Sequence, residues 1–156
     1  EEEDPDSTTG VVDVALAGDR SVYPGLVGSV ASAARARRRK RLRFWVFIGD
    51  AGDVEAVRAA LRCAAPGAEM NVSPFSSLSS RNVTLRAPVG PSYGNLKSPS
   101  NFARFFLAEE LPESDKVIYL DADVVVRRDL ADLLDASADD VAVAAGPRAA
   151  DGVDLV

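Results

Sequence analysis

Residues Lys116–Val126 read Lys-Val-Ile-Tyr-Leu-Asp-Ala-Asp-Val-Val-Val, an apolar run that two aspartates interrupt. The part before the aspartates has the length and continuous apolar character of a buried parallel strand. Alternate residues of an extended chain point the same way, so Asp121 and Asp123 are predicted to project to one side, with the small Ala122 between them. Carboxylates this close repel each other, and a hard divalent cation such as Mg²⁺ or Mn²⁺ would relieve the repulsion while binding substrate phosphates. The alternative is a pair of solvated aspartates at a strand end.

Strands and helices alternate on either side of this stretch. Strands are predicted at 11–17, 42–48, 116–120 and 141–145, with a short, weak one at 69–72. Helices are predicted from Pro24 to Arg35, from an Asp53 cap to Ala65, from Ser98 or Ser100 to Pro112, and from an Asp129 cap to Leu134. Most of the strands are continuously apolar, which indicates an α/β fold with a mostly parallel sheet covered on both faces. Residues 73–99 are predicted to form a long loop.

The composition limits the classes of function. The 156 residues are 47% hydrophobic and 27% charged, which is typical of one soluble globular domain. The net charge of −6 argues against broad binding to nucleic acid, and no apolar run approaches the ~18 residues of a membrane span. Histidine is absent, which excludes a Ser-His-Asp triad, an imidazole zinc site and a histidine general base.

Two further features favour structural interpretations. Cys63, the single cysteine, lies in a predicted helix, where we expect a small buried side chain rather than a reactive thiol. Residues 35–43 are rich in Arg and Lys and could bind an acidic polysaccharide, a membrane surface or nucleic acid. Their position between a helix end and a strand favours a solvated connector whose cations complement the helix C-terminus.

Carboxylates follow two of the predicted strands. Asp19 comes after the strand at 11–17, and Asp121 with Asp123 after the strand at 116–120. In an open parallel sheet, ligands bind beyond the carboxyl ends of the strands. We therefore expect one cleft that Asp19 shares with the other two aspartates, although Asp19 could instead be an ordinary turn residue.

The motifs around these aspartates resemble a known family. Residues 101–104 (Asn-Phe-Ala-Arg), 111–112 (Leu-Pro) and 116–126 are similar to the central signature of glycosyltransferase family 8. That family includes glycogenin, bacterial lipopolysaccharide galactosyltransferases and the plant galacturonosyltransferase-like proteins. Residues 12–16, followed by Asp19 and by 25–32, resemble the opening of the plant-type members. The resemblance covers roughly residues 11–146 and is strongest from Asn101 to Leu134.

The resemblance implies a GT-A-type nucleotide-sugar fold and a set of site residues. Asp121 and Asp123 would hold Mn²⁺ (or Mg²⁺) against the diphosphate of a UDP-sugar, with Ala122 leaving room for the ligand. Ala17 and Asp19 would contact uracil or ribose. Arg104 would touch the sugar or phosphate, unless it is only a surface residue of its helix. The implied reaction transfers a hexosyl or hexuronosyl group from UDP to a glycan acceptor with retention, and no residue is assigned as nucleophile or base.

The sequence also departs from the family pattern. Val22 aligns with a family aromatic, and Tyr23 follows one place later. The family's third metal ligand, a histidine, and its Gly-Lys-Pro-Trp-like segment have no counterpart here. We therefore expect residues 1–10 to be a disordered acidic lead-in and 11–156 to be a nucleotide-binding domain without the C-terminal acceptor-binding half.

Two other functions stay open at this point. In a haloacid-dehalogenase-like phosphotransferase, Asp121 would be the nucleophile and Asp123 a general acid, but that fold normally needs long downstream sequence. A non-catalytic nucleotide- or metal-binding remnant is the other alternative. Two Asn-x-Ser/Thr sequons, at Asn71 and Asn82, and the plant-like resemblance lead us to expect the Golgi or secretory lumen, while the oligomeric state is undetermined.

Overall fold

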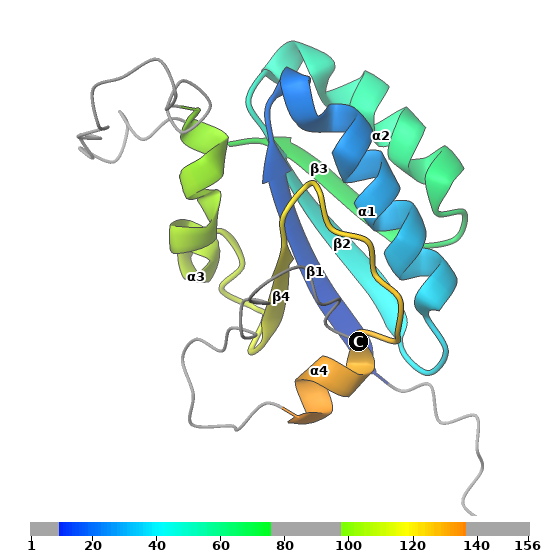
Figure 1. The fold of residues 1–156 in the computed structure, drawn as a ribbon. Helices are drawn as coiled ribbons and strands as arrows, with labels where there is room; N and C mark the ends of the chain where they lie inside the picture. The colour runs from blue at the N-terminus through cyan, green and yellow to red at the C-terminus, as the bar shows by residue number, and fades with distance from the viewer. Residues whose placement is uncertain (1–9, 76–97, 137–156) are drawn as a thin grey trace, which may run out of the picture.

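The computed structural model describes residues 10–75 and 98–136. Its strands are β1 (Val11–Gly18), β2 (Arg41–Ile48), β3 (Glu69–Pro74) and β4 (Val117–Leu120), and they form one parallel sheet in the order β3-β2-β1-β4 (Figure 1). The chain builds outward from β1 to β3 and then returns to place β4 on the other side of β1. The strand order reverses between β1 and β4, which is the position where open α/β sheets bind ligands. The predicted parallel α/β sheet is confirmed.

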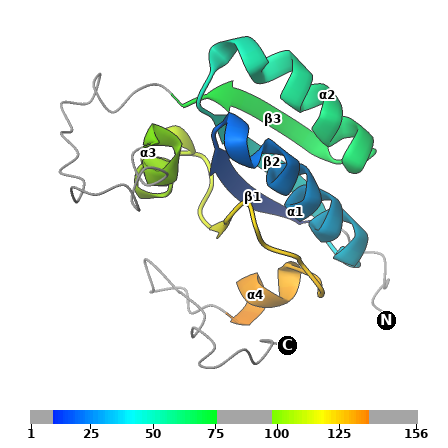
Figure 2. The same ribbon diagram turned by 45° about the horizontal axis from the view of Figure 1, so that its top comes forward.

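Helices cover both faces of this sheet (Figures 1 and 2). Helices α1 (Tyr23–Ala36) and α2 (Val54–Ala64) lie on one face, and the 3-10 helix η5 (Pro99–Phe106) with α3 (Leu107–Glu110) lies on the other. Alternation along β1 supplies both cores. Val14 and Leu16 pack in the α1–α2 cluster, whereas Ala15 and Ala17 pack with Phe47 in the η5 cluster.

The helix predicted to start at Ser98 or Ser100 differs in form. Residues 99–106 coil as a 3-10 helix, and only Leu107–Glu110 is α-helical. A 3-10 coil aligns residues three apart, so Ala103 and Phe106 both pack on the sheet while Phe105 is 73% exposed. The Ser98 hydroxyl does not cap the helix but lies 2.8 Å from the Ser100 hydroxyl.

Two predictions on α2 are wrong. The Asp53 side chain does not cap the helix, because Arg20 occupies it, and Asp50 instead caps the preceding 3-10 turn η2 (Ala51–Asp53) through the Gly52 amide. Cys63 is exposed rather than buried. Val57 and Leu61 face the sheet, and Cys63 lies off their stripe on the helix.

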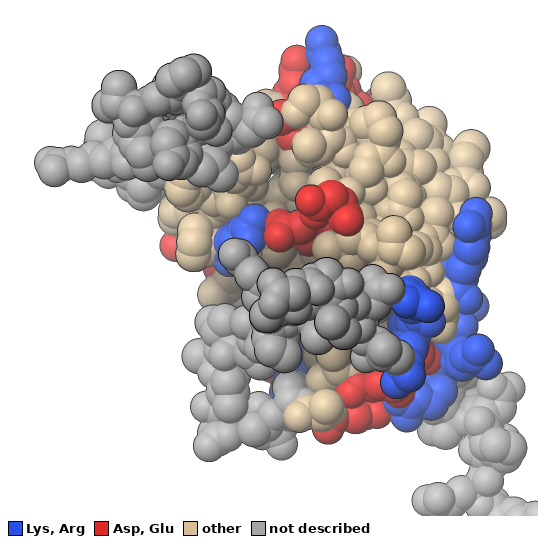
Figure 3. Space-filling model, in the orientation of Figure 1, with Lys and Arg blue, Asp and Glu red and all other residues tan. Residues whose placement is uncertain are grey.

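The basic connector between α1 and β2 packs against α4 (Ala131–Ala136) at the amino-terminal end of the sheet, where charges of both signs gather (Figure 3). Arg39 Nη2 lies 2.6 Å from Asp132 Oδ1, and Lys40 Nζ lies 3.3 Å from Asp135 Oδ1. Asp129 caps α4 through the Ala131 amide, as predicted. These contacts agree with a structural role for the connector.

Several predictions fall outside the described residues: the lead-in at 1–10 except for its last residue, most of the 73–99 loop and the strand at 141–145. Among the described residues, no helix has both the length and the apolar character needed to cross a membrane.

Candidate functional site

A cavity of about 420 Å³ opens at the carboxyl ends of β1 and β4. It is bounded by the end of β1, the turn into α1, η5 and the segment that follows β4. Nine residues line it: Ala17, Ser21, Val22, Gly25, Asn101, Tyr119, Asp121, Ala122 and Asp123. Four of the six residues predicted from the sequence therefore meet in one place, at the reversal of strand order.

Asp121 and Asp123 lie just beyond β4 and line the same cavity. The chain turns here, with the Val124 amide donating to the Asp121 carbonyl oxygen at 3.4 Å. The Asp121 side chain is 51% exposed, so a ligand can reach it from solvent. The space-filling view shows an acidic patch between the α3 segment and α1, with a basic side chain beside it (Figure 3).

Arg104 reaches this patch from η5. Its Nη2 donates to Asp121 Oδ1 at 2.7 Å, and its guanidinium carbon lies 4.8 Å from the centre of the Tyr119 ring. The ring face attracts the cation and holds it beside the carboxylate. Burial raises the pKa of Tyr119, so this ring stays neutral at physiological pH. Arg104 is therefore a direct partner of Asp121, a contact that the sequence pattern did not reveal.

Asp19 does not line the cavity, so the expectation that it shares one cleft with Asp121 and Asp123 is wrong. It caps the 3-10 turn η1 (Arg20–Val22), accepting from the Ser21 amide at 3.0 Å and from the Ser21 hydroxyl. The hydroxyl of Ser21 holds the pKa of Asp19 below its usual value. Ser21 does line the cavity, so Asp19 orients a residue of the wall. Its proposed contact with uracil or ribose stays a prediction.

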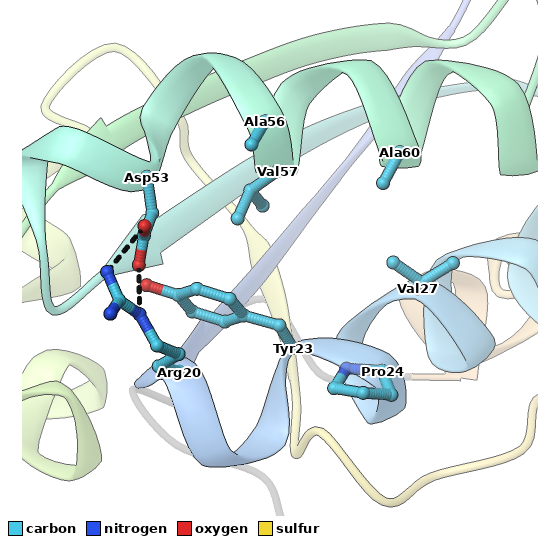
Figure 4. Close-up of a pocket in the computed structure, with 8 residues that line it drawn as sticks. All are labelled: Arg20, Tyr23, Pro24, Val27, Asp53, Ala56, Val57 and Ala60. Atoms are coloured by element: carbon cyan, nitrogen blue, oxygen red, sulfur yellow. Dashed lines mark hydrogen bonds and ion pairs between the residues drawn. The ribbon is translucent and has the colours of Figure 1, made fainter.

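Val22 and Tyr23 line two different cavities. Val22 lines the site, whereas Tyr23 lines a second cavity of about 340 Å³ between α1 and α2 (Figure 4). Apolar side chains make most of that lining, and Arg20 closes one end with bonds of 2.7 and 2.9 Å to Asp53. These bonds hold the pKa of Asp53 below its usual value. The carboxylate of this second cavity is thus already occupied by a structural partner.

The carboxylates of the first cavity suit a hard cation. Mg²⁺ and Mn²⁺ prefer oxygen ligands, and Mg²⁺ sites commonly combine one or two carboxylates with water and phosphate oxygens. Within residues 10–75 and 98–136, no group of three or more His, Cys, Asp or Glu side chains gathers to hold a metal. A cation held by Asp121 and Asp123 would need its other oxygen ligands from water or from a phosphate-bearing ligand.

Comparison with known proteins identifies the family. The model of glycosyl transferase family 8 matches residues 13–149. The chain belongs to glycosyl transferase family 8. A curated relative, glycosyltransferase 8 domain-containing protein 1 of Xenopus tropicalis, is 57% identical over 35 residues, which are 22% of this chain and 9% of the relative.

Solved structures of glycosyltransferases share the fold. The Q189E active-site mutant of LgtC is 26% identical, with a TM-score of 0.61 over 81% of this family 8 chain and 42% of LgtC. Another LgtC structure, a galactosyltransferase by its description, contains donor and acceptor sugar analogues. The bifunctional glycosyltransferase WbbM, at 22% identity and a TM-score of 0.60, is covered over 21% of its length and shows the fold alone. This chain thus spans less than half of these structures. Family membership disfavours the haloacid-dehalogenase alternative.

Proposed function

We propose that this chain binds a UDP-sugar together with Mn²⁺ or Mg²⁺ in the cavity between β1 and β4, for transfer of a hexosyl or hexuronosyl group to a glycan acceptor with retention. The observation that carries the proposal is that Asp121 and Asp123 line one open cavity at the reversal of strand order. The donor and acceptor analogues in the LgtC structure support a sugar-donor ligand.

Each wall of the cavity would have its own task. Asp121 and Asp123 would hold the cation, whose positive charge would neutralise charge developing on the leaving diphosphate. Ala122 is small and leaves the backbone accessible beside them. Ala17 and Ser21 form the wall at the end of β1 and would accommodate the base or ribose, with Asp19 holding Ser21 in place.

Arg104 adds a second positive charge at the same place. Its guanidinium forms an ion pair with Asp121, and its side chain is 40% exposed. A guanidinium recognises phosphate oxygens through charge-assisted hydrogen bonds. Arg104 would therefore bind the donor diphosphate while still orienting Asp121.

Isothermal titration of UDP, with and without Mn²⁺, tests the proposal. We expect binding that requires the metal and that Asp123→Ala weakens by at least about tenfold, the loss expected when a charged partner is removed. Asp115→Ala is the matched control, because Asp115 is an exposed carboxylate just before β4 and does not line the cavity. Binding without metal, no binding, or equal loss in both variants would refute the proposal.

A non-catalytic binding module is the second candidate. One observation favours it: among the described residues, no third metal-binding side chain joins the two aspartates. Incubation of the full chain with UDP-galactose and UDP-galacturonic acid separates the two: release of UDP, with or without an acceptor, supports the transferase, whereas tight Mn²⁺-dependent UDP binding without turnover supports the binding module.

We also propose a setting in the Golgi or secretory lumen, supported by the two sequons. The Asn71 side-chain nitrogen is buried in β3, so a glycan on the folded chain is expected at the Asn82 sequon instead. A glycosidase-sensitive mass shift that Asn82→Gln removes, in material from a secretory host, checks this.

A further inference from the structure

The hydroxyl of Ser29, buried in the middle of α1, faces the backbone of the segment that carries the two aspartates. Its Oγ lies 2.8 Å from the carbonyl oxygen of Val124, 3.2 Å from that of Ala122 and 3.3 Å from that of Asp121. A serine hydroxyl has one proton to donate. Val124, at the shortest distance, takes the main hydrogen bond, and the other two carbonyls share the positive end of the O–H dipole.

Gly25 and Ser32 extend this contact along the same face of α1. A Cβ on Gly25 would lie 2.4 Å from the Ala122 carbonyl oxygen, so the helix and the segment touch backbone to backbone. One turn after Ser29, the Ser32 hydroxyl accepts from the Val126 amide at 2.9 Å and donates to the Ser29 carbonyl oxygen at 2.8 Å. Positions 25, 29 and 32 are spaced by four and three residues, which places them on one side of a helix.

The segment 121–126 depends on this support because it lies outside the sheet. Strand β4 ends at Leu120, and the turn bond from the Val124 amide to the Asp121 carbonyl oxygen is long, at 3.4 Å. A hydrogen bond of this length is weak and constrains the turn less than a short one would. The hydrogen bonds from Ser29 and Ser32 of α1 add the constraint on this backbone that the turn bond does not provide.

We propose that Ser29 is a positioning residue that holds the backbone of residues 121–124 so that Asp121 and Asp123 face the cavity together. Gly25 and Ser32 form the two ends of the same contact. The consequence for ligand binding rests on the proposed donor site, whereas the effect on the segment itself does not.

Amide hydrogen exchange of the full chain tests the effect on the segment without any ligand. In Ser29→Ala, we expect peptides that cover residues 121–126 to exchange about fivefold faster, the factor that corresponds to one net hydrogen bond. Peptides from β1 and β2 should exchange as in the wild type. Val57→Ala is the control, because it shortens a buried side chain on α2 that lines the second cavity rather than the site. If Ser29→Ala does not fold, Ser29→Cys, which has a similar shape and a weaker donor, is measured by the same criterion.

Titration of UDP in the presence of Mn²⁺ then tests the consequence for binding. We expect Ser29→Ala to weaken UDP binding at least about fivefold, again the factor of one net hydrogen bond, and Val57→Ala to leave it unchanged. Ser29→Cys should lie between Ser29→Ala and the wild type.

The outcomes separate the two ideas. Unchanged exchange in residues 121–126 overturns the positioning role, whatever the titration shows. If Ser29→Ala exchanges faster but binds UDP as tightly as the wild type, Ser29 positions the segment but does not matter for UDP binding. If Ser29→Ala exchanges faster but the wild type itself binds no UDP, the positioning of the segment is supported and only the proposed donor site is overturned.

Discussion

Arg104 and Asp121 form an ion pair of 2.7 Å at the mouth of the cavity, and the aromatic face of Tyr119 holds the arginine in place. A cation therefore already contacts the carboxylate that is proposed to bind the metal. Like charges repel over such short distances, so we expect Arg104 to lower the affinity of Asp121 for a metal ion alone. A ligand that carries phosphate would reverse this effect, because it brings negative charge to both cations.

Arg104→Ala should separate the two effects. We expect Mn²⁺ alone to bind several-fold tighter, because a repelling charge is gone. UDP at saturating Mn²⁺ should bind about tenfold more weakly, because a charge-assisted bond is lost. The stability should change by less than about 1 kcal/mol, since the pair is exposed. Titration calorimetry measures both affinities, with Arg62→Ala on the outer face of α2 as control. A parallel fall of both affinities would contradict this prediction.

Two glycines of α1 should respond in opposite ways to alanine. Gly25→Ala places a Cβ 2.4 Å from the Ala122 carbonyl oxygen, and the overpacking should cost about 1–3 kcal/mol. Gly28→Ala meets nothing within 4 Å and should stabilise the helix by up to about 1 kcal/mol. Urea denaturation measures both free energies of unfolding. Equal effects would show that the helix and the segment do not touch.

Asp13 on β1 should make stability depend on acid pH. It accepts from Arg43 Nη2 at 2.8 Å, from Trp45 Nε1 at 2.8 Å and from Ser114 Oγ at 2.9 Å. Burial alone would raise the pKa of Asp13, but the bonds from Arg43, Trp45 and Ser114 outweigh it and hold the pKa below 3.8. A lowered pKa in the folded state adds stability above the unfolded value, and this stability is lost as pH falls through the folded value.

Asp13→Asn is therefore expected to lose about 2 kcal/mol at pH 7 and to approach the wild type below about pH 4. The single tryptophan, Trp45, reports unfolding directly by fluorescence. Asp115→Asn, at an exposed position, serves as the control. A difference that stays constant from pH 7 to pH 3 would rule out this origin of the acid sensitivity.

Asp129 should contribute more to the free energy of unfolding than the exposed ion pair between Arg39 and Asp132 beside it. The carboxylate is buried and accepts from the amides of Arg38, Arg39 and Ala131 at 2.8–3.0 Å. Asp129→Ala leaves those amides without their acceptor and should cost about 2–3 kcal/mol. Asp132→Ala, which removes only an exposed partner of Arg39, should cost less than about 1 kcal/mol. Thermal unfolding ranks the two, and the reverse order would disprove the assignment.

The sheet was predictable because burial on both faces makes parallel strands apolar throughout. β1 and β2 come close to this pattern, which is interrupted by Asp13 in β1 and by Arg41 and Arg43 in β2. Pro24 lies in the first turn of α1 as expected. The position of Asp121 and Asp123 at a strand end was also predictable from local rules. The extended chain expected for them is wrong, because residues 121–124 form a turn, and both aspartates nevertheless line the cavity.

The remainder depended on contacts between distant segments. The hydrogen bonds of Ser29 join it to carbonyls that lie 92 to 95 positions later in the chain, and no sequence pattern in α1 predicts these partners. One signal was present: Gly25, Ser29 and Ser32 interrupt the apolar face of the helix at helical spacing. Asp53 illustrates the opposite error, since its position suits a cap but Arg20 competes for the carboxylate.

The distance along the chain between Ser29 and the carbonyls it serves also has a kinetic consequence. Contacts of such high sequence separation form slowly, because a long loop must close before they provide any stability. The local units β1-α1-β2 and β2-α2-β3 can assemble first, whereas the acidic segment joins them only when β4 docks beside β1. During refolding, the proposed nucleotide site should therefore form after most of the secondary structure.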